Sequence, residues 1–156
     1  MKRYKNIWIG LTMTWMVFIF YMSDQPSSIS STQSNKVIDI MSKSSLLRSS
    51  INHLINIGKI DFVVRKFAHM FLYFILAILI YLALKNRYGI KAYIYSLIGS
   101  FVYACTDEIH QLFIPGRSGE FKDVLVDSLG ALIGLTIVFI INNLLLGKED
   151  LKKKDV

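Results

Sequence analysis

Four long apolar runs constrain this chain more strongly than any other feature of its sequence. They cover about residues 7–22, 62–84, 92–113 and 123–146. With a rise of about 1.5 Å per residue, a helix of about 20 residues spans the roughly 30 Å hydrocarbon core of a bilayer. We therefore predict an all-α, polytopic membrane protein with four transmembrane helices, folded as a single membrane domain over residues 1–156.

The composition of the chain supports a membrane protein and argues against a nucleic-acid-binding module. Hydrophobic residues make up 53% of the sequence, and the formal net charge is +7. The basic residues lie in short clusters beside the apolar runs, without the aromatic and basic platform that stacks bases. We expect membrane lipids as partners and no nucleic acid. The single cysteine, Cys105, has no partner for a disulfide or a metal.

A long polar section separates the first two apolar runs. Within it, apolar residues recur at helical spacing over about residues 30–57, with polar residues on the other side. The sequence Ser30-x-x-Gln33 has the form of a capping box, which indicates a helix start. We predict an amphipathic helical segment that either lies on the membrane surface or packs over the mouth of the helix bundle.

The distribution of basic residues predicts the orientation of the chain. The amino terminus, the loop at residues 85–91 and the carboxyl tail are all short and basic. Short cytoplasmic segments of membrane proteins carry an excess of Lys and Arg. We therefore predict a multi-pass protein with cytoplasmic amino and carboxyl termini, which places the amphipathic segment on the outer side.

Polar residues gather at the four helix ends that would then face outward. Charged side chains at the edge of a hydrocarbon span are costly, so they need a partner or a function. The residues brought to this side are Asp24, Arg65, Lys66, His69, Asp107, Glu108, His110, Gln111, Asp123 and Asp127. The sequence therefore predicts an outward-facing polar pocket, with Arg117 in the connection between the last two runs.

Helical spacing indicates which of these side chains share a face. Arg65, His69 and Tyr73 follow one another at intervals of four residues. Asp107 and Glu108 are adjacent, so a rotation of about 100° can turn Glu108 elsewhere. The residues that we predict to form the binding site are Arg65, His69, Tyr73, Asp107, Glu108, Gln111, Arg117, Asp123 and Asp127.

Small residues at helical spacing predict close contacts between helices. The fourth run contains Gly130 and Gly134, and the third contains Ser96, Ser100 and Ala104. Residues of this size let the backbones of neighbouring membrane helices approach closely. We therefore expect these two runs to pack tightly inside the bundle.

Three interpretations of the polar pocket are open from the residues alone. The arginines can pair with the aspartates and hold the helices in register. Arg65 and Arg117 can instead bind a phosphate or carboxylate, since the guanidinium fork suits such anions. A third interpretation is general acid–base chemistry, for which the catalytic candidates are His69, His110, Asp107 and Asp123. The same histidines and aspartates are also able to hold a divalent cation. Because no zinc-type motif is present, we predict neither a metal site nor a cofactor.

Three motifs carry a resemblance to a known family. They are Arg65-Lys66-x-x-His69-x-x-x-Tyr73, Asp107-Glu108-x-x-Gln111-x-x-x-Pro115-Gly116-Arg117 and Asp123-x-x-x-Asp127-x-x-Gly130-x-x-x-Gly134. Together with their spacing, they resemble the VanZ-like family of small bacterial membrane proteins. Two positions depart from that pattern. Leu72 stands where many relatives carry an acidic residue, and Asp127 stands where asparagine is common.

The resemblance implies a protein of the bacterial plasma membrane that gives accessory resistance to lipoglycopeptide antibiotics such as teicoplanin. We expect its pocket to recognise an anionic, lipid-linked cell-wall component or the antibiotic itself. The alternative is an intramembrane enzyme that uses a His/Asp acid–base pair on a lipid-linked substrate. A third class is a structural partner subunit without a ligand of its own.

Overall fold

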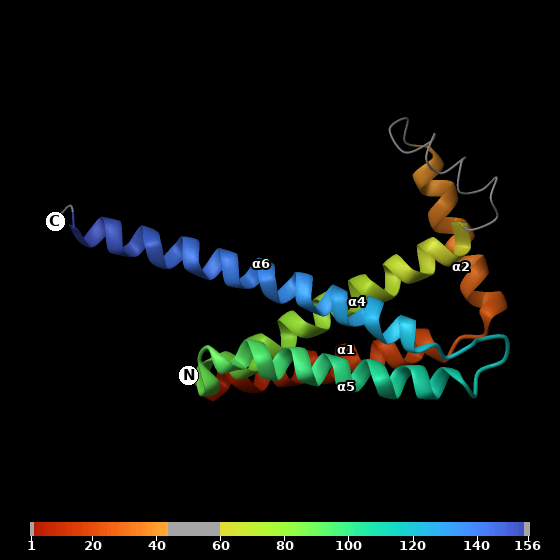
Figure 1. Ribbon diagram of the computed structural model, residues 1–156, viewed down its shortest axis with the longest axis horizontal. Coiled ribbons are helices and arrows are strands. Elements are labelled where there is room, and N and C mark those ends of the chain that lie inside the picture. Colours follow the sequence, from red (N-terminus) through yellow and green to blue (C-terminus); the bar gives the residue numbers. More distant parts are fainter. Residues whose placement is uncertain (1, 44–59, 155–156) are drawn as a thin grey trace.

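The computed structural model describes residues 2–43 and 60–154, and this part of the chain forms helices and no strands (Figure 1). Its helices are α1 (Lys2–Ser23), α2 (Ser27–Ser42), α4 (Ile60–Tyr88), α5 (Lys91–Gln111) and α6 (Phe121–Lys154). Figure 1 shows α1 and α5 ending at the same end of the bundle at which α4 and α6 begin. The predicted all-α class is therefore confirmed for the described residues.

Three of the described helices are long and apolar enough to cross a membrane. The candidate spans are Asn6–Ser23, Phe62–Tyr88 and Phe121–Leu145, in α1, α4 and α6. The fourth expected span corresponds to α5, which is 21 residues long but is not among these candidates. The acidic and polar side chains at its carboxyl end lower its mean hydropathy. A fourth crossing therefore stays a prediction.

The amphipathic segment starts earlier than its sequence pattern indicates. Helix α2 begins at Ser27 and not near Ser30, because the Pro26 carbonyl accepts hydrogen bonds from the backbone N–H groups of Ile29 and Ser30, both at 3.1 Å. Helix α2 packs against α4. The rest of the predicted segment, residues 44–57, lies outside the described residues.

Glycine residues bring α6 directly onto the backbone of α4. A side chain added at Gly130 would collide with the Met70 carbonyl oxygen, and a Cβ at Gly134 would lie 2.7 Å from the Phe74 carbonyl oxygen. On α5, Ser96, Ser100 and Ala104 are all fully buried. The close approach predicted from Gly130 and Gly134 is therefore confirmed, with α4 as the neighbouring helix, and it holds the start of α6 against α4.

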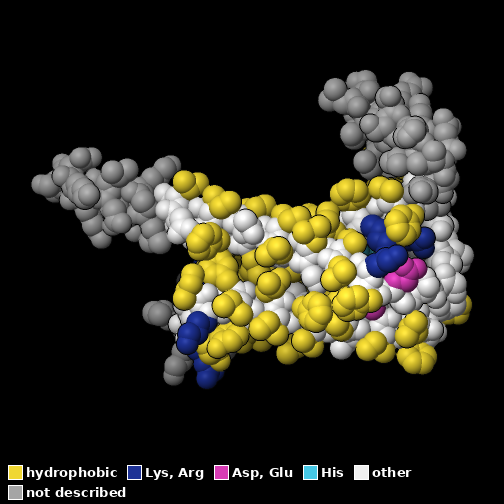
Figure 2. Space-filling view, in the orientation of Figure 1, with side chains coloured by type: hydrophobic (Ala, Val, Ile, Leu, Met, Phe, Trp, Pro, Cys, Tyr) yellow, Lys and Arg dark blue, Asp and Glu magenta, His cyan; other side chains and the backbone are white. Residues whose placement is uncertain are grey.

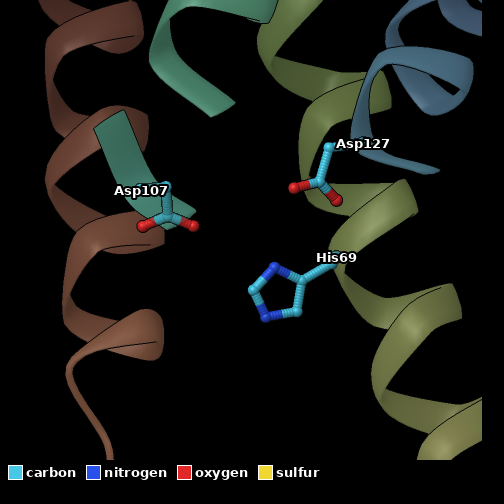
Figure 3. Close-up of side chains that lie close together, drawn as sticks. All are labelled: His69, Asp107 and Asp127. Atoms are coloured by element: carbon cyan, nitrogen blue, oxygen red, sulfur yellow. The ribbon is translucent and has the colours of Figure 1, made fainter. Parts of the chain in front are cut away.

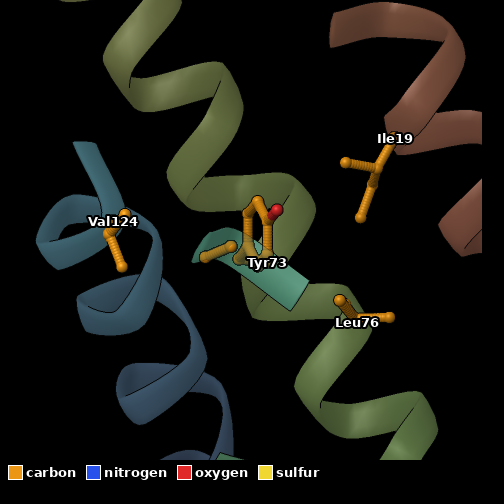
Figure 4. Packing of buried hydrophobic residues seen from close by; sticks show 5 residues of the cluster. Ile19, Tyr73, Leu76 and Val124 are labelled. Carbon is orange, nitrogen blue, oxygen red and sulfur yellow. The ribbon is translucent and has the colours of Figure 1, made fainter. Parts of the chain in front are cut away.

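A small apolar core lies beneath the polar end of the bundle. It contains Ile19, Tyr73, Leu76, Ala104 and Val124, which come from α1, α4, α5 and α6 (Figure 4). Packing between four helices from distant parts of the sequence fixes where each polar helix end lies.

The surface of the described residues separates into apolar and charged regions. Figure 2 shows hydrophobic side chains along the middle of the molecule, basic and acidic side chains together at one end, and a separate group of basic side chains at the other. Exposed aromatic and aliphatic residues include Val17, Phe71, Ile98, Leu125 and Phe139. Apolar surface of this extent is typical of a protein whose middle faces lipid.

Candidate functional site

A cavity of about 180 Å³ opens at the charged end of the bundle. Its walls come from the start of α4, the end of α5, the connection between α5 and α6, and the start of α6. The lining residues are Phe62, Arg65, Lys66, His69, Glu108, Gln111, Gly116, Arg117, Ser118, Glu120, Asp123 and Asp127. The cavity therefore combines cations, carboxylates and one imidazole within a small volume.

Most of the residues predicted to bind a ligand meet at this cavity. Those that line it are Arg65, His69, Glu108, Gln111, Arg117, Asp123 and Asp127. Asp107 does not line the cavity and is buried behind it, with only 2% of its surface exposed. Tyr73 is fully buried in the apolar core beneath. Helical spacing alone did not distinguish the residues that line the cavity from Asp107 and Tyr73, which lie deeper.

Glu108 lines the cavity, although the sequence left open whether its side chain turns elsewhere. The connection after α5 folds back over the helix end, and the backbone N–H of Glu120 donates a hydrogen bond of 3.0 Å to Glu108 Oε2. A side chain at Gly119 would collide with the Glu108 carbonyl oxygen, so the connection passes very close to α5. This loop contact, which helical periodicity does not contain, places Glu108 in the site.

Arg117 joins the connection between α5 and α6 to the end of α1. Its Nε donates to the Gln25 carbonyl at 2.8 Å, and its Nη2 donates to the Met22 carbonyl at 3.2 Å and to Ser30 Oγ at 2.6 Å. A cation at a helix carboxyl end satisfies free carbonyls and interacts favourably with the helix dipole. Arg117 therefore has a structural role in addition to lining the cavity.

Burial lowers the pKa of the Arg117 guanidinium from its ordinary value, and the charge of Arg65 acts in the same direction. The ordinary pKa of arginine is so high that the side chain nevertheless stays protonated. Two cationic groups thus repel each other across the same cavity. An anion between them would relieve this repulsion.

Lys66 pairs with Asp123 on the wall of the cavity, where both side chains are 21% exposed. The sequence does not identify this pair, since the two residues lie far apart in the chain. Asp123 was predicted as a binding or catalytic residue. Its pairing with Lys66 means that it also ties α6 to α4.

One imidazole and two carboxylates converge at the inner side of the cavity. His69, Asp107 and Asp127 each offer a ligand atom, and these three atoms all lie within 4.8 Å of one another (Figure 3). Asp107 Oδ2 accepts a hydrogen bond of 2.7 Å from Ser23 Oγ, and Gln111 Nε2 lies 3.5 Å from the same oxygen. Ser23 was not among the predicted site residues, because an uncharged serine gives no signal in the sequence, yet its hydroxyl positions Asp107.

His110, the other histidine considered for catalysis, lies outside the cavity. Its ring stacks on Phe20 with centroids 4.3 Å apart, and its Nε2 lies 3.2 Å from Asp24 Oδ1. The side chain of Asp24 is half exposed. This pair therefore connects the ends of α1 and α5 at the surface, away from His69.

The chain was also compared with known proteins. The model of one protein family, described as VanZ/LLP1, matches residues 8–142. This range includes most of α1, all of α2, α4 and α5, and most of α6, and therefore every residue of the cavity. No curated protein and no solved structure matched the chain in the other two comparisons.

Proposed function

The chain belongs to the VanZ/LLP1 family, and on this basis we propose that it binds an anionic, lipid-linked component of the bacterial cell envelope. The protein crosses the plasma membrane several times, with both termini in the cytoplasm and the cavity facing outward. Occupation of the cavity gives accessory resistance to lipoglycopeptide antibiotics of the teicoplanin type.

The observation that carries this proposal is the pair of arginines in one small cavity. Arg65 and Arg117 both line it, and their charges repel each other. Guanidinium groups recognise phosphate and carboxylate oxygens through paired hydrogen bonds. Arg65 can offer such a pair, whereas Arg117, whose Nε and Nη2 already donate to α1, Gln25 and Ser30, contributes mainly its charge. A phosphate or carboxylate headgroup would therefore gain two charged partners and offset their mutual repulsion.

The size of the cavity favours a headgroup over a whole antibiotic. Its volume is about 180 Å³, whereas pockets for drug-sized molecules begin at about 300 Å³. A lipid-linked ligand can place a small anionic group in the cavity while its hydrocarbon chain stays in the membrane. The apolar surface beside the charged end in Figure 2 is compatible with such a chain.

The test is a teicoplanin susceptibility assay in a sensitive bacterial host. Arg65→Ala should remove the resistance that the wild-type chain confers, without lowering the amount of protein in the membrane. Arg87→Ala is the matched control, because Arg87 lies at the other end of α4 and outside the cavity. Arg117 is a less clean choice, since it also holds the end of α1. Full resistance in Arg65→Ala would contradict the proposal.

A second candidate function is an intramembrane enzyme, and the proximity of His69 to Asp107 and Asp127 favours it. An aspartate beside an imidazole can orient it for general acid–base catalysis. Under this alternative, His69→Gln and Asp107→Asn would keep binding of a polyprenyl phosphate in nanodiscs but stop its conversion. Under the binding function, no conversion of that lipid occurs in the wild type.

A further inference from the structure

We propose that His69, Asp107 and Asp127 bind one divalent transition-metal ion, of the zinc or manganese class, at the inner side of the cavity. This site goes beyond the proposed function and does not depend on it, because arginines can recognise an anion without a metal. It also reverses the expectation from the sequence, in which no metal motif was found.

The geometry of the three side chains is the first argument. They come from α4, α5 and α6, and Figure 3 shows the two carboxylates and the imidazole facing a common space. Their ligand atoms lie within 4.8 Å of one another. The ligand atoms of a tetrahedral zinc site lie roughly 3.4 Å apart, as follows from metal–ligand distances of about 2.1 Å. A contraction of up to about 1.4 Å on binding would complete the site.

The second argument is the lack of hydrogen-bond partners around the buried carboxylates. Asp127 is 1% exposed, and neither of its oxygens has a hydrogen-bond partner among the described residues. Within the same part of the chain, Asp107 Oδ1 also has none. Buried charged groups are normally paired or coordinate a metal. Two such carboxylates close together repel each other strongly, and a divalent cation between them would offset both costs.

Of the three cations that line the cavity, Lys66 and Arg117 are engaged elsewhere in the site, and no ion pair among the described residues joins Arg65 to Asp107 or Asp127. Lys66 pairs with Asp123. Arg117 directs its Nε and Nη2 towards α1 and Ser30. The described side chains thus leave Asp107 and Asp127 without an ion pair, and a bound cation would fill this role.

The surroundings of Asp107 resemble the support that metal ligands receive in proteins. Its Oδ2 accepts a hydrogen bond from Ser23 Oγ, which fixes the carboxylate and leaves Oδ1 for a further contact. Such outer contacts orient metal ligands and raise metal affinity by about 10- to 100-fold. Ser23 is itself fully buried, so solvent does not compete for the hydroxyl that donates to Asp107.

The ligand set selects the class of metal. An imidazole nitrogen suits zinc and other transition metals, whereas carboxylates suit manganese as well as magnesium and calcium. The presence of one nitrogen among the three ligands favours a transition metal over magnesium or calcium. Because His69 and Asp127 line the cavity, the remaining coordination positions would face it.

The experiment uses the untagged full-length protein in detergent, stripped of metal and then titrated with Zn²⁺, Mn²⁺, Mg²⁺ or Ca²⁺. Calorimetry should show about one Zn²⁺ or Mn²⁺ per chain, as for a single three-ligand protein site. The affinity for Mg²⁺ and Ca²⁺ should be weaker. Bound Zn²⁺ or Mn²⁺ should also raise the unfolding temperature of the wild-type protein.

Asp127→Asn and His69→Gln should each lower the metal affinity by at least about 100-fold, more than the loss of an outer contact. Ser23→Ala, which removes only such a contact, should lower it by about 10-fold. The matched control is His110→Gln, which removes the surface histidine that pairs with Asp24, and it should bind metal like the wild type.

Two results would overturn the site. One is the absence of stoichiometric Zn²⁺ and Mn²⁺ binding to the wild type. The other is binding that stays unchanged in both Asp127→Asn and His69→Gln. Neither result bears on anion binding by Arg65, so the failure of this site and the failure of the proposed function are distinguishable.

Discussion

The two ends of the helix bundle use polar residues in different ways. At the end opposite the cavity, Asn142 Nδ2 donates to the hydroxyl oxygens of Tyr81 and Tyr93, both at 2.9 Å. At the cavity end, Asp107 and Asp127 are buried with carboxylate oxygens that have no hydrogen-bond partner among the described residues. The first network is closed, which means that its side chains bond one another. The second is open, because carboxylate oxygens in it lack a partner among the described residues.

This difference distinguishes structural polar residues from candidate binding residues more clearly than the number of polar residues at each end does. A closed network of neutral groups holds helices together and leaves little for a ligand to do. Buried polar atoms without partners are rare, so each one calls for an explanation such as an ion or a ligand. The comparison therefore indicates a structural role for Asn142 and supports the binding role that we propose for the cavity end.

The largest expected effect on stability concerns Arg117, which lines the cavity and also holds the end of α1. Arg117→Ala should lower the free energy of unfolding by about 3 kcal/mol, because several charge-assisted hydrogen bonds to α1 and Ser30 are lost. SDS titration of the purified protein would measure it. Arg87→Ala, at the opposite end, should change stability by less than about 0.5 kcal/mol. Equal effects at both ends would remove the contrast between them.

The next effect tests whether close packing of α6 on α4 supports the cavity end. Gly130→Ala should destabilise the protein by about 2 kcal/mol, since the added methyl group collides with the Met70 backbone. Gly10→Ala is the control, because a Cβ there meets nothing within 4 Å. It should be neutral or slightly stabilising in the same titration. A stable Gly130→Ala protein would show that the helices can separate at no cost.

A smaller effect is expected at the closed network. Asn142→Ala should cost about 1 kcal/mol, the usual scale for hydrogen bonds between membrane helices. Teicoplanin resistance should remain at the wild-type level as long as membrane abundance is maintained. Loss of resistance at normal abundance would mean that this end also takes part in function.

The smallest effect is expected at the surface pair of the cavity end. Asp24→Asn should change stability by less than about 0.5 kcal/mol, because Asp24 is half exposed and its contact with His110 is weakened by solvent. Chemical denaturation at low and high salt would measure it. A loss above 2 kcal/mol would indicate that His110 and Asp24 belong to the buried site after all.

Much of the fold and part of the site follow from the sequence. The apolar runs predict α1, α4 and α6 as candidate spans, and Gly130 and Gly134 predict a close approach to another helix, which the structure identifies as α4. The polar helix ends also predict that Arg65 and Asp127 lie near one another. Those inferences succeed because the period of a helix and the thickness of a bilayer act locally on the chain.

Other parts of the site could not be predicted in this way. Nothing in the spacing of Ser23 and Asp107 shows that they share a hydrogen bond, because 84 residues separate them. Likewise, the contact of Glu120 with Glu108 depends on how the connection between α5 and α6 folds back. Such pairs form only when the helices have packed, so no local pattern contains them.

The sequence by itself therefore determined that the chain is helical, apolar along much of its length and polar at matching helix ends. Only the tertiary structure decided which polar residues pair and which remain without a partner. Lys66 forms an ion pair with Asp123, whereas the ligand atoms of His69, Asp107 and Asp127 lie close together. The physical reason is that helix formation depends on neighbours in the chain, while the rotation and depth of each helix depend on packing. That packing brings the charged helix ends together at the cavity for which we propose an anion and a metal ion.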